Sequence, residues 1–489
     1  MPQQVRLSSL RHIAICLLAT LPLAALAGCG GSSSLTGISI PPGTNNAVLN
    51  GQYAFSFSGQ NANGFLAAAG SFTADGNGNI TNGQEDVNNG TGALNLALTG
   101  TYSIGTDGRG IALLNTSAGP ATWEFTMLNG THALMIRFDT FATASGTIDR
   151  QDATAFTNGS LQGNYVFGFG GLGVNLGSLA MAGTMTLDGA GGILSGVLDA
   201  NDLGVVIANS PLVGNYSVAS NGRGLASITS GFGTQTFVFY VISTTDLKFL
   251  ETDALPITTG DVLRGLSGPF TNGSIAGRYA FTFGGESTTN LNPVAAGGLL
   301  TSDGNGNLSG FTLDFNNNGS VSTQSGTGAY TVNSAGRGSA TFAGLQVAFY
   351  PAADGTLELT EIDPNFVTGG AAKLQAAGPF SLSTVSGKFA LNFAGTNLNT
   401  VAEEDIAGQI AADGAGNLTG SLDINNSGNI FQGVGLGTAS YTMPSNGRGT
   451  ANISSSLATF SLNTYQVDAN TVLFLEVDQT RVLTGIMQK

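Results

Sequence analysis

The chain repeats one unit four times, and this repetition constrains its fold more than any other feature. The unit opens with an aromatic motif that occurs as GQYAFSFSG at 51–59, GNYVFGFGG at 163–171, GRYAFTFGG at 277–285 and GKFALNFAG at 387–395. Successive copies are 112, 114 and 110 residues apart. Within each motif, large apolar residues alternate with small ones, as Tyr53, Phe55 and Phe57 do. A period of two predicts a strand with its aromatic side chains on one buried face.

The remainder of each unit predicts short strands joined by tight turns. GSFTADGNGNITNG at 70–83 and GTYSIGTDGRGIALL at 100–114 each place an Asp-Gly turn between two strand-like runs, which is a strong hairpin signal. We therefore predict an all-β fold of four tandem antiparallel domains, each with about eight strands. An up-and-down barrel is favoured because closure removes exposed strand edges. A β-sandwich or an eight-bladed propeller remains an alternative.

The repeats also set the domain boundaries. We predict a signal peptide at 1–28, a lipidated cysteine and flexible tether at 29–49, and β-repeats at 50–152, 153–267, 268–378 and 379–489. The joints contain Phe156, Pro269-Phe270 and Pro379-Phe380. If these rings pack between neighbouring units, the four domains form a semi-rigid rod.

The N-terminus carries an export signal. Arg6 and Arg11 precede an apolar run from Ile13 to Ala27, which ends in Leu26, Ala27, Gly28 and Cys29. This ending resembles the lipobox of bacterial lipoproteins, and the repeats resemble the Gly/Asn-rich β-repeats of uncharacterised exported lipoproteins. The resemblance implies cleavage before Cys29, a covalent lipid on Cys29 and anchoring in the cell envelope. Because Gly30 rather than Asp follows the cysteine, it further implies the outer membrane.

Cysteine and charge content exclude several classes of protein. The only other cysteine, Cys16, lies in the signal peptide, so the mature chain is expected to contain no disulfide. The net charge is −15, and charged residues make up only 9% of the chain. Such an acidic surface argues against nucleic acid as a partner. The membrane is the expected partner, through the lipid.

One arginine recurs in every unit. Arg109, Arg223, Arg337 and Arg448 each follow a turn glycine and precede another glycine. We interpret them as structural turn residues whose guanidinium groups bond nearby carboxylates or backbone carbonyls of the same unit. Asp86 or its neighbours are the expected partners in the first unit.

Few residues are suited to catalysis or metal binding. His132 is the only histidine outside the signal peptide, which excludes a repeated catalytic triad or zinc site. We interpret it as a solvated turn residue. An Asp-x-Asn motif does recur, at Asp86/Asn88, Asp199/Asn201, Asp314/Asn316 and Asp423/Asn425. Asp314, Asn316 and Asn318 match the start of a calcium-binding EF-hand loop, but its twelfth position is Ser325 instead of Glu. Capping of strand ends is therefore favoured over calcium.

A second set of carboxylates closes each unit: Asp139, Asp253, Asp363 and Asp478. Glu251, Glu361 and Glu476 stand two residues before the last three. Paired carboxylates are what a glycosidase needs, yet adjacent pairs in near-identical copies indicate a structural role, with Asp starting the following turn. We predict no catalytic residues, no enzyme activity and no cofactor other than the lipid.

These observations favour a non-enzymatic surface lipoprotein with structural, adhesive or recognition roles, because repetition multiplies binding surface. The alternative is a carrier of a small apolar or glycan ligand inside barrels, since the pattern is similar to that of avidin-type and lipocalin-type barrels. An envelope hydrolase is a remote alternative. The partner could be a glycan, a protein or a small apolar ligand.

Overall fold

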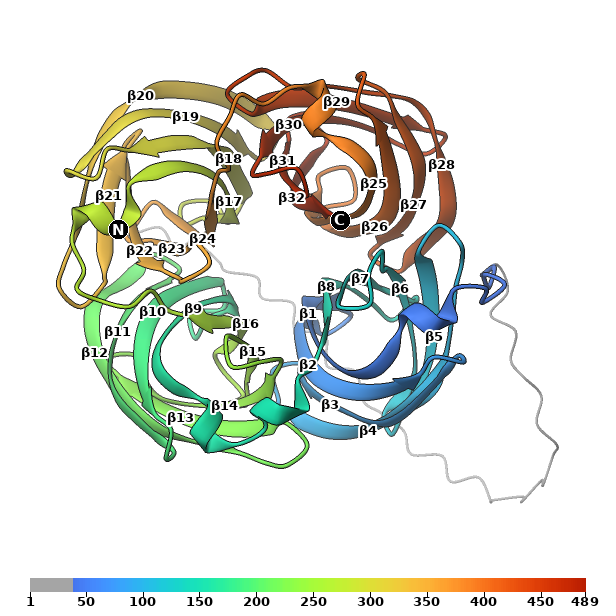
Figure 1. The fold of residues 1–489 in the computed structure, drawn as a ribbon, viewed down its shortest axis with the longest axis horizontal. Helices are drawn as coiled ribbons and strands as arrows, with labels where there is room; N and C mark the ends of the chain where they lie inside the picture. The colour runs from blue at the N-terminus through green and yellow to red at the C-terminus, as the bar shows by residue number, and fades with distance from the viewer. Residues whose placement is uncertain (1–37) are drawn as a thin grey trace, which may run out of the picture. The chain divides into compact units, whose positions relative to one another are not determined.

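The computed structural model describes residues 38–489, which contain four closed eight-stranded antiparallel barrels (Figure 1). The signal peptide and the lipobox residues Leu26, Ala27, Gly28 and Cys29 lie outside the described residues. In each barrel, consecutive strands pair with one another and the last strand pairs with the first, as Phe55 of β1 does with Ile148 of β8. The predicted up-and-down barrel is confirmed, and the sandwich and propeller alternatives are wrong.

The strands of the first two barrels follow one pattern of lengths. Barrel 1 consists of β1 (Asn50–Asn61), β2 (Gly64–Asp75), β3 (Asn79–Asn88), β4 (Leu94–Ile104), β5 (Arg109–Thr116), β6 (Gly119–Thr126), β7 (His132–Phe138) and β8 (Ala142–Arg150). Barrel 2 consists of β9 (Gln162–Leu172), β10 (Ser178–Asp188), β11 (Gly192–Asp202), β12 (Val205–Val218), β13 (Arg223–Ser230), β14 (Gly233–Val241), β15 (Asp246–Glu251) and β16 (Ile257–Arg264).

The last two barrels repeat that pattern. Barrel 3 consists of β17 (Gly277–Ser287), β18 (Pro293–Ser302), β19 (Asn307–Asn317), β20 (Ser320–Val332), β21 (Gly338–Phe342), β22 (Leu345–Pro351), β23 (Thr356–Glu361) and β24 (Phe366–Leu374). Barrel 4 consists of β25 (Ser386–Asn397), β26 (Ala402–Asp413), β27 (Leu418–Asn426), β28 (Asn429–Thr442), β29 (Arg448–Ser455), β30 (Thr459–Gln466), β31 (Thr471–Glu476) and β32 (Arg481–Gln488).

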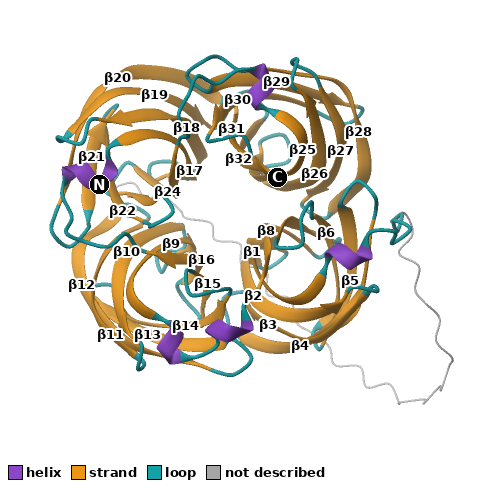
Figure 2. Cartoon of the chain, viewed as in Figure 1, coloured by secondary structure: helices purple, strands orange, loops and turns teal. Residues whose placement is uncertain are grey.

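In the described part of the chain, helix is confined to short 3-10 turns between or before barrels (Figure 2). These turns are η1 (Asn46–Val48), η2 (Ala153–Ala155), η3 (Asn158–Ser160), η4 (Asn272–Ile275) and η5 (Leu382–Thr384). Among residues 38–489, none of the helices is long and apolar enough to cross a membrane.

The aromatic residues of the opening strands fill the barrel interiors. In barrel 1, Phe55 packs edge-on against Trp123 with ring centroids 4.7 Å apart, and both side chains are fully buried. In barrel 2, Phe167 stacks on Phe169 at 4.8 Å. The spaces found inside barrels 3 and 4 measure about 30 and 10 Å³. These interiors are packed cores, so the predicted carrier alternative, with a ligand inside each barrel, loses its structural basis.

The glycines on either side of the recurring arginine have separate structural causes. Gly336 has a φ of +86°, the left-handed conformation that the tight turn before Arg337 requires. Gly338 begins β21, and a Cβ there would lie 2.0 Å from the ring of Phe349. A side chain at this position would therefore overlap the packed core.

The joint phenylalanines pack differently from the prediction. Phe270 lies against the turn of the barrel that follows it, 2.9 Å from the Cβ position of Gly336. Phe156 and Phe380 are buried with the cores of barrels 2 and 4. Each ring covers one end of its own barrel, so the expectation that these rings pack between units is wrong.

The four barrels within Ser39–Lys489 form one compact unit instead of a rod. Barrel 1 contacts barrel 2, barrel 2 contacts barrel 3, and barrel 3 contacts barrel 4 through side-chain hydrogen bonds. Barrel 4 also contacts barrel 1, because Thr143 Oγ1 donates to Asp405 Oδ2 at 2.7 Å. The contacts therefore close into a ring, which corrects the prediction of a semi-rigid rod.

Candidate functional sites: the barrel joints and the central cavity

The recurring arginine binds the recurring aspartate across the joint between neighbouring barrels. Arg223 of barrel 2 donates through Nε and Nη2 to the two carboxylate oxygens of Asp86 in barrel 1, at 2.8 and 2.9 Å. Tyr240, which is paired with Arg223 on β14, donates its hydroxyl to the same carboxylate. A fork-to-fork arrangement of this kind fixes both distance and orientation.

The next two joints repeat this triad. Arg337 and Tyr350 of barrel 3 bind Asp199 of barrel 2, with arginine distances of 2.6 and 2.7 Å. Arg448 of barrel 4 binds Asp314 of barrel 3 at 2.8 and 2.6 Å, and Tyr465 donates to it at 2.7 Å. We call these three the sequential joints.

The asparagine of the Asp-x-Asn motif also reaches into the next barrel. Asn88 Nδ2 donates to the carbonyls of Glu251 and Asp253, at 2.9 and 2.7 Å. The equivalent side chains, Asn201, Asn316 and Asn425, donate to carbonyls at the same position of the barrel that follows each in the ring. The motif therefore joins neighbouring barrels. At the sequential joints its Asp accepts bonds from the arginine and tyrosine side chains of the next barrel, and its Asn donates to backbone carbonyls of that barrel.

Small residues let the tyrosines approach. A Cβ at Gly297 of barrel 3 would lie 2.4 Å from the ring of Tyr465. Alanines occupy this position at the other sequential joints, where Ala69 packs with Tyr240 and Ala182 with Tyr350. Desolvation, together with Asp86, raises the pKa of Tyr240 well above its ordinary value, so its hydroxyl remains a donor. At Asp314, desolvation raises the pKa, but bonds from Arg448, Thr323 and Tyr465 outweigh it and lower the pKa overall.

The joint that closes the ring, between barrels 4 and 1, departs from this construction. Only Nη1 of Arg109 reaches Asp423, at 3.3 Å from each oxygen, while its Nε binds Asp107 of its own turn at 2.8 Å. Thr126 is paired with Arg109 where the sequential joints have tyrosine, and it donates to the carbonyl of Gly408. We call this the closing joint.

The recurring arginines and aspartates do bind one another, but each pair joins two neighbouring barrels instead of lying within one barrel as expected. The aspartate of the Asp-x-Asn motif does bind a recurring arginine, but the arginine belongs to the following barrel, and Asp86 binds Arg223 instead of Arg109. The calcium prediction for Asp314, Asn316 and Asn318 loses support. Both oxygens of Asp314 accept bonds from Arg448, and Asn316 Oδ1 accepts from the backbone of Gly319.

His132 is part of a contact between barrels 1 and 4, which corrects its interpretation as a solvated turn residue. It begins β7, and its side chain is 31% exposed. Its Nδ1 lies 2.6 Å from Asp149 Oδ1, and its Nε2 lies 3.1 Å from Gln488 Oε1 of barrel 4.

The carboxylates that end each unit separate into two roles. Asp139, Asp363 and Asp478 accept backbone N–H bonds of the following turn, and Asp253 accepts from Thr236, consistent with a structural role. The preceding glutamates are buried. Desolvation raises the pKa of Glu251 to about 8 and the pKa of Glu361 and Glu476 to about 9. Each holds a proton at neutral pH within its barrel.

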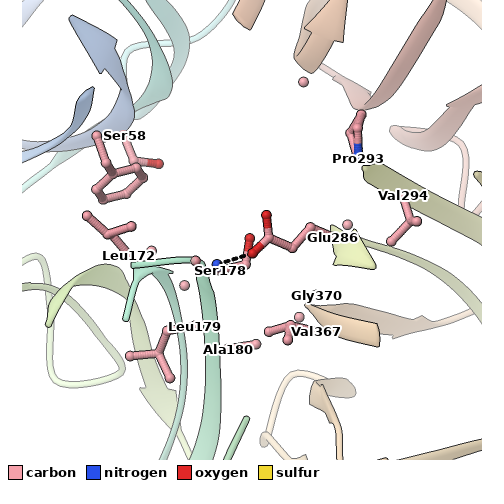
Figure 3. A pocket seen from close by; sticks show the side chains of 18 of the residues that line it. Ser58, Leu172, Ser178, Leu179, Ala180, Glu286, Pro293, Val294, Val367 and Gly370 are labelled. Carbon is pink, nitrogen blue, oxygen red and sulfur yellow. Dashed lines mark hydrogen bonds between the residues drawn. The ribbon is translucent and has the colours of Figure 1, made fainter. Parts of the chain in front are cut away.

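Sequence reasoning missed a cavity of about 710 Å³ that all four barrels line (Figure 3). The repeats contribute equivalent positions, seven residues after the first glycine of each opening motif: Ser58, Gly170, Gly284 and Ala394. These face away from the barrel cores, so in sequence they are indistinguishable from solvent-exposed small residues. The cavity becomes visible only when the ring is closed.

Within residues 38–489, the cavity is lined by acidic side chains and by no basic ones. Among the described residues, Glu286, Glu358 and Glu403 line it, and no lysine, arginine or histidine does. Glu286 extends toward barrel 2, where Oε1 accepts the backbone N–H of Ser178 at 2.5 Å (Figure 3). Desolvation raises the pKa of Glu358 to about 8, and the nearby charge of Asp261 adds to the rise. Much of the remaining wall is backbone, because glycines such as Gly170, Gly284 and Gly370 line it.

No protein-family model and no curated protein matches this chain. A search of solved structures finds a protein of unknown function of the DUF3598 family from Nostoc punctiforme, at 10% identity and a TM-score of 0.15, covering 45% of this chain and 98% of that chain. It also finds a Trp-176-Ala mutant of the vaccine antigen transferrin-binding protein B from Haemophilus parasuis. That match has 11% identity and a TM-score of 0.20, and covers 73% of this chain and 82% of that chain.

Proposed function

We propose that this protein is a non-enzymatic, lipid-anchored envelope protein whose four barrels form a rigid binding scaffold, with the central cavity holding the ligand. The cavity carries this proposal: it measures about 710 Å³, and equivalent positions of all four barrels line it. The packed barrel cores point the same way, because they leave the cavity and the outer faces as places for a ligand. A space of this size is in the range of ligand sites.

The walls favour one class of ligand. Exposed backbone from glycines and the side chains of Ser58, Gln60 and Thr396 offer hydrogen bonds, whereas the described lining residues include no lysine, arginine or histidine that would attract an anion. A neutral or positively charged ligand with many hydrogen-bonding groups, such as a glycan or a peptide strand, suits these walls. We favour the glycan because the walls combine polar groups with flat apolar surface from Phe65 and Leu172.

Filling the cavity should abolish binding without disturbing the barrels. The double variant Ser58→Trp/Ala394→Trp places two large rings in the cavity, and we expect at least a tenfold loss of affinity for purified envelope glycan, measured by calorimetry. Leu225→Trp is the matched control, because Leu225 is 50% exposed on β13 and does not line the cavity. Equal binding by both variants would place the ligand on an outer face, and failure of the parent protein to bind would reject the glycan.

The lipid anchor has a separate test. Cys29→Ser should move the protein from the membrane fraction to the aqueous fraction, because the lipid attaches to the sulfur of Cys29 and stable anchoring needs more than one acyl chain. Cys16→Ser is the control, since the proposed cleavage removes that residue with the signal peptide. Mass spectrometry of the N-terminal peptide checks the modification directly. Retention of the Cys29→Ser protein in the membrane fraction would contradict lipid anchoring.

A further inference from the structure

The closing joint differs from the sequential joints in its arginine–aspartate bonds as well as in sequence. Each sequential joint has two arginine nitrogens within 2.9 Å of the aspartate. The closing joint has one nitrogen at 3.3 Å and an arginine shared with Asp107. It also lacks the tyrosine. Because charge-assisted bonds weaken with distance and lost geometry, the arginine–aspartate pair contributes less here than at the sequential joints, and the barrels are held mainly by neutral bonds such as those of Thr126, Thr143 and Asn425.

The chain itself reinforces the sequential joints but leaves the closing joint unsupported. Barrels 1 and 2, 2 and 3, and 3 and 4 are joined by short covalent segments, such as the one between β8 and β9 at 151–161. Barrels 4 and 1 come from opposite ends of the described residues. If the contacts of a sequential joint break, its barrels remain tethered, whereas barrels 4 and 1 can separate.

The closing joint also buries carboxyl groups that repel one another. Glu124 on β6 and Asp423 on β27 are each 2% exposed, and Val238, Ala348 and Asn463 occupy the position of Glu124 in the other barrels. Desolvation raises the pKa of both groups, and Asp423 raises that of Glu124 further. The groups facing this pair are Arg109 and Asp107 of barrel 1, with Gln432 and the Gly433 N–H on β28 of barrel 4.

A segment ahead of barrel 1 reaches across this joint. The Ser39 N–H donates to Gln432 Oε1 at 2.5 Å, and the Ser39 carbonyl accepts from Gln432 Nε2 at 2.8 Å. The same Nε2 donates to Glu124 Oε1 at 2.6 Å. The segment is fixed to barrel 1, because Ser103 Oγ donates to the Pro41 carbonyl at 2.6 Å. Gln432 of barrel 4 therefore binds both barrel 1, through Glu124, and the segment ahead of barrel 1, through Ser39.

We propose that the closing joint is the gate of the ring: barrels 4 and 1 separate and reclose while the three sequential joints stay closed, and the contact of Ser39 with Gln432 holds the gate shut. The gate gives a long ligand a lateral route to the central cavity. Ionisation of both Glu124 and Asp423 opens it, because two buried negative charges would then share one distant guanidinium group. Opening is a property of the joint and does not depend on which ligand the cavity holds.

Distances between spin labels can test the gate in the full chain. One pair, Ser117→Cys with Ser456→Cys, spans the closing joint from exposed turns of barrels 1 and 4. The matched pair, Thr234→Cys with Thr341→Cys, spans the joint between barrels 2 and 3 at exposed positions. All versions carry Cys16→Ser and Cys29→Ser, so that only the introduced thiols react.

We expect a second, longer distance for the closing pair alone. Gln432→Ala should raise the population at that distance at least threefold. A change from pH 6 to pH 10 should do the same, and Glu124→Gln should reduce this pH effect, with the remainder coming from Asp405 at the same joint, whose pKa desolvation raises to about 8. A single distance for both pairs, unchanged by Gln432→Ala, would overturn the proposal. Equal broadening of both pairs would also overturn it, because the ring would then be loose at every joint.

Discussion

Asp199→Ala should destabilise the protein more than any other single substitution at a joint. The carboxylate of Asp199 is fully buried and binds Arg337 through two bonds and Tyr350 through a third. Its removal leaves the guanidinium group of Arg337, whose side chain is 14% exposed, and the buried hydroxyl of Tyr350 without their shared acceptor. Breaking a buried pair in this way costs about 3–5 kcal/mol. We expect the apparent Tm to fall by roughly 10 °C.

A graded series separates the contributions at this joint. Asp199→Asn keeps acceptor capacity but loses the charge, so its effect should be intermediate, and Tyr350→Phe, which removes one hydroxyl, should cost about 1–2 kcal/mol. Asp423→Ala at the closing joint is the matched comparison, and its 3.3 Å contacts predict a smaller loss. Scanning calorimetry measures all four variants. A Tm for Asp199→Ala within 2 °C of the parent, on the same scale, would contradict the role assigned to the triad.

Glu476→Gln should make the protein more stable at alkaline pH. Desolvation and a bond with Asp478 raise the pKa of Glu476 from its ordinary 4.5 to about 9. The folded state therefore keeps a proton that the unfolded chain loses above about pH 4.5. The contribution of Glu476 to stability is greatest below that pH and falls by about 1.4 kcal/mol per pH unit until about pH 9. Glutamine is isosteric with the protonated carboxyl, so the variant should lose this slope.

Urea unfolding at pH 4 and pH 8 measures the effect. At pH 4 the parent and the variant should agree within about 1 kcal/mol, whereas at pH 8 the variant should be more stable by several kcal/mol. Glu251→Gln and Glu361→Gln repeat the test in barrels 2 and 3, where the pKa values are about 8 and 9. Parallel curves for parent and variant from pH 4 to pH 8 would contradict a protonated glutamate.

The barrel fold could be predicted from sequence because its signals are local. Alternation in the opening motif, Asp-Gly turns and the Gly-Arg-Gly turn each act within a few residues. The partner of each arginine could not be predicted, because a contact within one repeat and a contact between two repeats use the same residue types. From the sequence alone, Asp86 is as suitable a partner for Arg109 as for Arg223. Only the three-dimensional placement of the barrels decides between them.

The central cavity escaped prediction for a related reason. Its walls come from outward-facing positions such as Ser58 and Gly284, which carry small residues in every unit. Such positions give no chemical signal until four of them face one another. The buried glutamates did leave a signal, because Glu251, Glu361 and Glu476 recur, but their protonation depends on burial within the barrel, which alternation alone does not show.

The pairing of the joints has a consequence for the number of barrels. Each barrel offers an Asp-x-Asn face to its successor and an arginine face to its predecessor, so the interface is head-to-tail and joins two different surfaces. Head-to-tail association either closes into a ring or continues as a filament, depending on the rotation at each step. Here the rotation from one barrel to the next closes the ring after four barrels. A chain with three or five such barrels would have an unmatched face at each end, available to other molecules of its own kind, whereas the fourth barrel leaves neither face unpaired.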